Sequence, residues 1–262
     1  AEQVPAAAWE LMETFWPGPL TLILRKQAWV PDAITGGQDT VGLRVPSHPV
    51  ALELLRRFAA VAGEHAGIAA PSANRFGRIS PTTAAHVQEE LGDRISLILD
   101  GGPCKVGIES TIVDFSRGEP VILRPGHVSP AHLEAVFGRQ LLIETAGGAP
   151  RVSGSLAAHY APQTPMRMVA GARLLDFLNA QRHKGGRCGV ISHSQPPQAG
   201  MPHAWRLLAA DPVGYAHEIY GALRELDHAG VDLIAVEALP EGAGWAAVAD
   251  RLRRAVAGSG GA

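Results

Sequence analysis

The sequence lacks several features that would place it in a common class of protein. It has only two cysteines, Cys104 and Cys188, which lie far apart and form no Cys-x-x-Cys pair. They predict reduced thiols in a cytoplasmic protein, not a disulfide framework or a zinc site. The chain has no signal-peptide pattern and no apolar run long enough to cross a bilayer, so we expect no membrane association. Its 11 histidines show no metal-ligand spacing, which predicts no protein metal site.

The chain also lacks an excess of positive charge. Its formal net charge is -2 and aromatic residues make up 5% of it, so its bulk charge gives no argument for nucleic-acid binding. What it has is apolar content: 46% of its 262 residues are hydrophobic and 18% are charged. That is enough for one large domain or two modest domains with real cores.

Two polar, glycine-bearing segments follow apolar runs that predict short strands. Residues 71–80 (PSANRFGRIS) follow residues 67–70, and residues 100–111 (DGGPCKVGIEST) follow residues 95–99. Because α/β proteins bind ligands in loops at strand ends, the two segments predict one nucleotide-sized pocket. The second segment is not a Walker A loop, because it lacks the Lys-Ser/Thr pair. A plain glycine-rich turn remains the alternative.

Single polar residues in these regions each allow two interpretations. Arg44 lies within the apolar strand predicted at residues 40–45, and Arg124 ends the strand VILR. An arginine there needs either a protein carboxylate or a ligand anion, phosphate or carboxylate. Ser72 and Ser80 have no Gly-x-Ser-x-Gly elbow around them, so a turn or helix-cap role is the alternative, with Ser80 as a candidate N-cap. Cys104 has no neighbouring histidine to activate it.

Hydrophobic periodicity predicts two α/β parts joined by a linker. The first part covers residues 1–144, the linker residues 145–165, and the second part residues 166–262. In the first part we expect helices at 6–15, 50–62, 82–91 and 129–137, strands at 20–26 and 40–45, and a strand pair at 110–115 and 120–124. The second part alternates strands and helices, which predicts a small parallel sheet. Its expected elements are strands at 166–169, 188–192 and 231–237 and helices at 173–181, 211–230 and 245–256.

The motifs FWPGPLTLIL, VGLRVPSHP, APSANRFGRISPTTA, ILDGGPCKVGIESTIVD and LRPG occur in this order, followed by HYAP in the linker. In this set the chain resembles the YrdC-domain family of threonylcarbamoyl-AMP synthases, in its two-domain form. The resemblance implies a YrdC-like twisted mixed sheet with helices, then a linker and a small Rossmann-like parallel α/β domain. Nothing in the chain matches the family's opening PTETVYGL-type loop, so we expect it to be part of a longer protein.

The resemblance also implies a reaction and its participants. The family makes threonylcarbamoyl-adenylate and diphosphate from L-threonine, bicarbonate and ATP, with Mg²⁺ accompanying the ATP, for the threonylcarbamoyl modification of tRNA. It therefore implies a cytoplasmic enzyme, with tRNA or tRNA-modification proteins as partners. Two alternatives of other classes stay open: an RNA-binding module, and a non-catalytic relative that binds ATP without turning it over.

Carried over residue by residue, the resemblance gives each candidate a role. Threonine would be bound by Arg44, Ala70 and Ser110. ATP would be bound by Thr40, Ser72, Ser80, Arg124, His159 and Tyr160. Strand alternation would put Thr40 and Arg44 on one face of their strand, and His159 and Tyr160 would form part of a lid. No protein nucleophile is required.

Overall fold

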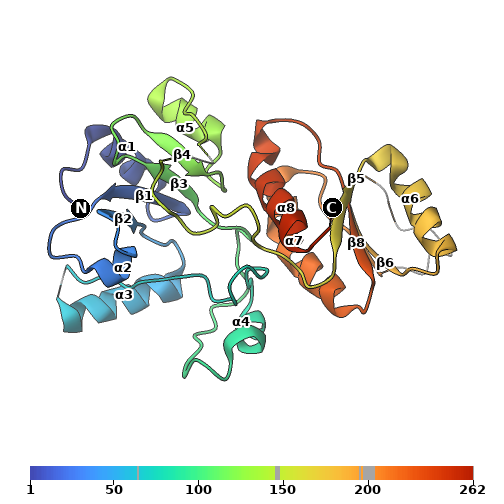
Figure 1. Cartoon of the computed structure of the whole chain (residues 1–262). Helices are drawn as coiled ribbons and strands as arrows, with labels where there is room; N and C mark the ends of the chain where they lie inside the picture. The colour runs from blue at the N-terminus through green and yellow to red at the C-terminus, as the bar shows by residue number, and fades with distance from the viewer. Residues whose placement is uncertain (64, 145–147, 195, 197–203, 262) are drawn as a thin grey trace. The chain divides into compact units, whose positions relative to one another are not determined.

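The computed structural model describes residues 1–63, 65–144, 148–194, 196 and 204–261, and Figure 1 shows its course. The chain forms two compact units. Unit 1 contains Ala1–Pro71 and Glu109–Ser155, and unit 2 contains Ser72–Ile108 and Leu156–Ala262. These units are not the same as the predicted domains, residues 1–144 and 166–262 with a linker at 145–165. The predicted domain limits therefore stay a prediction.

Unit 1 contains a mixed four-stranded sheet of the kind that the sequence predicts. Its order is β2 (Thr40–Leu43), β1 (Leu20–Arg25), β3 (Thr111–Asp114) and β4 (Val121–Arg124). β1 runs parallel to β3, and the two outer pairs are antiparallel. This register brings the start of β1, the end of β2, the start of β3 and the end of β4 to one edge of the sheet.

The described residues of unit 1 form four helices: α1 (Ala6–Phe15), α2 (Asp32–Thr35), α3 (Pro49–Ala62) and α5 (Pro130–Phe137). Leu11 of α1 and Leu133 of α5 are fully buried in one apolar cluster with Leu22 and Val113 of the sheet. α5 begins as the sequence predicts: Ser129 caps it, accepting a hydrogen bond from the backbone N–H of His132, and a proline follows. α3 forms, but none of its residues is buried.

Unit 2 contains an all-parallel sheet, which confirms the Rossmann-like prediction. Its order is β5 (Met166–Val169), β8 (Leu233–Glu237), β6 (Cys188–Ser192) and β7 (Ala204–Leu207). The helices of the unit are α4 (Ala84–Leu91), α6 (Gly171–His183), α7 (Pro212–His228), the short η1 (Ala243–Trp245) and α8 (Ala246–Gly258). No helix in the described part of the chain is long and apolar enough to cross a membrane.

Strand alternation divides the core of unit 2 between the two faces of the sheet. Ile191 and Val236 pack in a cluster with residues of α7 and α8. Their neighbours Val190 and Ala235 pack in another cluster, with Leu174 of α6. In Figure 1, α6 accordingly lies across the sheet from α7 and α8. The α7 face at residues 215, 219, 223 and 226, which the helical period predicts, is buried.

Two predicted strands do not form. Residues 67–70 and 95–99 have no regular secondary structure, and Ile68, Leu97 and Leu99 are exposed. A strand exists only where a neighbouring strand takes up its backbone hydrogen bonds, and an apolar run alone does not supply that neighbour.

Two element ends also differ from the prediction. β2 ends at Leu43, and the carbonyl of Val45 instead accepts a hydrogen bond from Gly18 N at 2.8 Å. The N-cap of α4 is Thr83, whose side chain accepts from the backbone N–H of His86, so Ser80 is not its cap. Ser80 is buried in the loop before the helix.

Candidate functional site

A serine–arginine cluster lies at the edge of the unit 1 sheet where β3 begins and β4 ends. The Arg124 guanidinium donates to Ser110 O at 3.0 Å, to Ser110 Oγ at 3.2 Å and to Ser153 O at 2.8 Å. The Ser110 hydroxyl also lies 2.8 Å from Thr21 Oγ1 of β1. Ser110 and Arg124 are both buried. These bonds orient the guanidinium at this edge of the sheet.

Close backbone packing explains the glycine of the LRPG motif. A Cβ on Gly126 would lie 2.5 Å from Thr111 N and 2.6 Å from Glu109 O. Only glycine lets the turn after β4 lie directly against the segment that carries Ser110. The motif therefore has a structural reason: it fixes the loop beside the cluster.

Arg44 lies at the same edge of the sheet but in a different environment. It follows the last residue of β2 and is exposed, so the expectation of an arginine inside an apolar strand is wrong. Among the described residues it has no ion pair or hydrogen bond, which removes the predicted alternative of a protein carboxylate as its partner. Ala70 is exposed in an irregular segment of the same unit.

Thr40 lies at the other end of β2, where it pairs with Arg25 of β1. Four residues of a strand separate it from Arg44 by about 13 Å, so the two do not share one small subsite. Thr40 is buried beside a hollow of about 460 Å³. The lining of this hollow is Arg25, Gly37, Gln38, Asp39, Thr40, Ser116, Arg117, Gly148, Ala149 and Pro150.

One wall of the hollow is fixed by a buried carboxylate. Asp114 accepts hydrogen bonds from Ser116 N at 2.8 Å, Ser116 Oγ at 2.7 Å and Arg117 Nε at 2.7 Å. Arg117 also pairs with Glu144 at 2.6 Å, and hydrogen bonds to these two carboxylates raise its pKa. Arg117 therefore has two anionic partners, which fix its side chain in this wall of the hollow.

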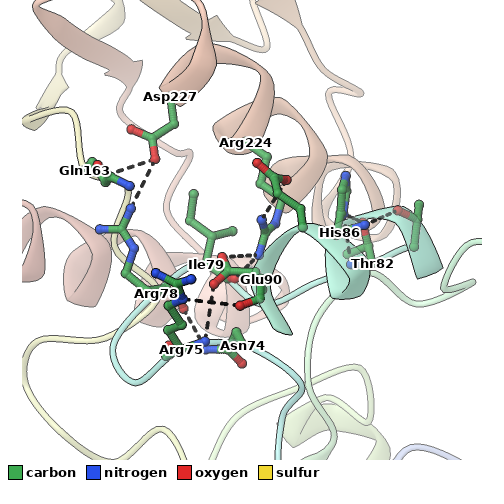
Figure 2. Close-up of polar contacts among 12 residues, drawn as sticks. Asn74, Arg75, Arg78, Ile79, Thr82, His86, Glu90, Gln163, Arg224 and Asp227 are labelled. Carbon is green, nitrogen blue, oxygen red and sulfur yellow. Dashed lines mark hydrogen bonds and ion pairs between the residues drawn. The ribbon is translucent and has the colours of Figure 1, made fainter. Parts of the chain in front are cut away.

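In unit 2, the loop of residues 74–80 is held by side chains from α4 and α7 (Figure 2). Arg224 of α7 donates through Nη2 to Ile79 O at 2.5 Å and to Glu90 Oε1 of α4 at 3.0 Å. Glu90 in turn accepts from Arg75 N at 3.3 Å, and Asn74 Nδ2 donates to Arg78 O at 3.1 Å. The loop is therefore an ordered turn that places the buried Ser80, whereas Ser72 is exposed.

The HYAP segment lies beside this loop. Ala161 N donates to Gly77 O at 2.9 Å, and Ala161 forms a parallel bridge with Arg78. The rings of His159 and Phe76 are 6.3 Å apart in an edge-to-face arrangement. Both His159 and Tyr160 are buried. Tyr160 has a φ of 60°, an uncommon conformation for a bulky residue.

The second predicted loop contacts α7 near its end. The Lys105 carbonyl lies 3.0 Å from His217 Nδ1, and a Cβ on Gly107, whose φ is 86°, would lie 2.4 Å from both Ala216 O and His217 Cα. Gly107 therefore has a packing reason, while residues 101–105 are exposed. Desolvation raises the pKa of the Cys104 thiol, which does not suit a nucleophile. Among the described residues, no group of three or more His, Cys, Asp or Glu side chains could hold a metal ion.

The structure thus brings the predicted residues together in two sets. Ser110 and Arg124 meet in unit 1, and the loop of Ser80 meets the segment of His159 and Tyr160 in unit 2. No local sequence pattern indicated the residues that hold the second set: Glu90, Arg224 and Asp227. Arg224 lies 134 positions from Glu90, and Asp227 lies 149 positions from Arg78. A charged residue in an amphipathic helix normally indicates a solvated face.

Comparisons with known proteins agree with this arrangement. A family model described as "Telomere recombination" matches residues 1–126, and one described as "Threonylcarbamoyl-AMP synthase, C-terminal domain" matches residues 128–257. The threonylcarbamoyl-AMP synthase of Pyrococcus abyssi is 36% identical over 97% of this chain and 75% of its own length. That of Bacillus subtilis is 36% identical over 97% of this chain and 74% of its own length.

Solved structures give the same result. The crystal structure of P. abyssi Sua5 complexed with L-threonine has a TM-score of 0.85 and 34% identity, covering 99% of this chain and 76% of that one. Together with the mixed α/β fold, these relatives define an ATP-using transferase. The chain belongs to the threonylcarbamoyl-AMP synthase family.

Proposed function

We propose that the protein forms threonylcarbamoyl-adenylate and diphosphate from L-threonine, bicarbonate and ATP. The observation that carries this proposal is the family membership over 97% of the chain, with the motif residues Ser110 and Arg124 gathered at one edge of the sheet. The product would serve the threonylcarbamoyl modification of tRNA, with tRNA or its modifying proteins as partners. A cytoplasmic site of action fits the two free cysteines.

We assign threonine to Arg44, Ala70 and Ser110, of which Arg44 and Ser110 lie at one edge of the unit 1 sheet. The exposed Arg44 can pair with the threonine carboxylate in a bidentate manner, which would orient the amine. Ser110 would donate or accept through its hydroxyl.

The ATP residues of the proposal are Thr40, Ser72, Ser80, Arg124, His159 and Tyr160. Arg124 would face the phosphates, because a guanidinium matches phosphate oxygens in a bidentate manner and its bonds to Ser110 and Ser153 orient it. Mg²⁺ would enter with ATP as part of that substrate, bound mainly by phosphate oxygens and water.

The chemistry needs no covalent intermediate on the protein. The threonine amine would attack the carbon of bicarbonate-derived CO₂ and lose a proton, giving a carbamate. A carbamate oxygen would then attack the α-phosphorus of ATP. The bond between the α-phosphorus and the oxygen that bridges it to the β-phosphate breaks, and diphosphate leaves. The protein would contribute positioning and charge neutralisation.

Diphosphate release by the full-length protein tests the proposal. We expect release from ATP only when threonine and bicarbonate are both present, with threonylcarbamoyl-adenylate detected by mass spectrometry. Release at the same rate without threonine would refute the assignment.

A further inference from the structure

Asp227, in the last turn of α7, bonds to two separate segments of unit 2 (Figure 2). Its carboxylate accepts hydrogen bonds from Gln163 N at 2.9 Å and Thr164 N at 2.8 Å, and it pairs with Arg78 at 3.5 Å. Its side chain is only 8% exposed. A negative charge at a helix C-terminus opposes the helix dipole, so this carboxylate is held there by its partners and not by helix preference.

The partners belong to the two segments that carry the proposed nucleotide residues of unit 2. Arg78 lies in the loop of Ser80, two positions before it. Gln163 and Thr164 directly follow the HYAP segment of His159 and Tyr160. One carboxylate can serve both segments because it has two acceptor oxygens and its donors are fixed backbone N–H groups and a guanidinium.

We propose that Asp227 is a positioning residue for the nucleotide site, holding the Ser80 loop and the HYAP segment in one relative position. This inference rests on the proposed function, because that function makes Ser80, His159 and Tyr160 ATP contacts. It adds a role for helix α7 of the second predicted domain in placing those contacts.

Hydrogen exchange tests, without any catalytic turnover, whether Asp227 holds the two segments together; we call this set of contacts the Asp227 clamp. In Asp227→Asn an amide NH₂ replaces one acceptor and faces a backbone donor, so exchange in residues 74–80 and 159–164 should become at least threefold faster in both segments. The matched control is Asp232→Asn, because Asp232 accepts from Arg187 N at 2.8 Å in the same unit and contacts neither segment. Faster exchange in only one segment, or equal changes in the control, would overturn the proposal.

Kinetics of the full-length protein test the positioning. Asp227→Asn should raise the KM for ATP at least tenfold with the KM for threonine nearly unchanged, and its effect should shrink at least threefold when Ser80→Ala is already present. A purely structural role would lower the active fraction and leave both KM values unchanged, which would contradict the proposal.

A milder variant covers the case in which Asp227→Asn does not fold. Arg78→Met removes only the ion pair, so the exchange rate in residues 74–80 and the KM for ATP should both rise. The proposal would be overturned if either quantity stayed unchanged. If the wild-type protein released diphosphate without threonine, the proposed function would fail, while the exchange experiment would still report on the clamp.

Discussion

The two sets of candidate residues are held in place in different ways. In unit 1, Arg124 ends β4 and Ser110, 14 positions before it, directly precedes the neighbouring β3, so the register of the sheet itself brings them together. In unit 2, the loop of residues 74–80 is fixed by α7, whose Arg224 lies 145 positions from Ile79. The first set needs only its own sheet. The second set is complete only when the C-terminal part of the chain has folded. Substitutions in α7 should therefore also destabilise the loop of residues 74–80.

The largest effect should come from removing the α7 arginine. Arg224→Met keeps the apolar stem but leaves the Glu90 carboxylate, 13% exposed, without its cation, and breaking such a buried pair costs about 3–5 kcal/mol. Arg124→Met should cost less, about 1–3 kcal/mol, which is the usual penalty for leaving buried acceptors such as the carbonyls of Ser110 and Ser153 without their donor. Urea unfolding of both variants measures the difference. Equal losses would show that the two regions are held alike.

The second effect concerns the close approach of Gly107 to α7. Gly107→Ala would place a Cβ against the helix backbone in a left-handed conformation, and we expect a loss of about 2–4 kcal/mol from overpacking and backbone strain. Gly102→Ala is the matched control: its φ is 84°, but a Cβ there would meet nothing within 4 Å. It should cost about 1 kcal/mol, for strain alone. Thermal melts of the two variants should therefore differ; similar melts would mean that the helix moves to accommodate the methyl group.

The difference between the two units also explains what could be predicted from the sequence. Local hydrophobic periodicity predicted the strands at 111–114 and 121–124 and the buried face of α7. The sequence motifs identified Ser110 and Arg124 as candidate site residues. The contacts of Arg224, Glu90 and Asp227 depend on tertiary folding, which no local pattern encodes. Residues 67–70 failed as a strand for a related reason: their apolar run gives a propensity, but a strand also needs a partner elsewhere in the chain.

A third prediction uses Arg44, which contrasts with Arg124 because it is exposed. Arg44→Ala should raise the KM for threonine at least tenfold, equivalent to about 1.4 kcal/mol, while the KM for ATP changes little. Without ligand its stability should stay within about 0.5 kcal/mol of wild type, as for other surface substitutions. Threonine titrations at saturating ATP, with melts of the ligand-free protein, measure both. A large loss of stability with an unchanged threonine response would remove Arg44 from the site.

The smallest effect should be a pH dependence in the unit 2 sheet. Glu237, buried at the end of β8, accepts hydrogen bonds from Ser194 Oγ and from the backbone N–H groups of His193 and Ser194, at 2.8 and 3.0 Å. Burial raises the pKa of this carboxyl, but the hydrogen bonds lower it more, so its pKa lies below the ordinary value. A carboxyl group whose pKa is lower in the folded state stabilises the fold when the pH is above the unfolded-state pKa of about 4.3. This contribution is lost as the pH falls through the lower pKa of the folded state.

Glu237→Gln should therefore be less stable than wild type by about 1 kcal/mol at pH 7, and the difference should shrink as the pH falls below about 4.3. Melts between pH 7 and pH 3 measure it, and a difference that stayed constant over this range would show that the charge of Glu237 makes no contribution to stability.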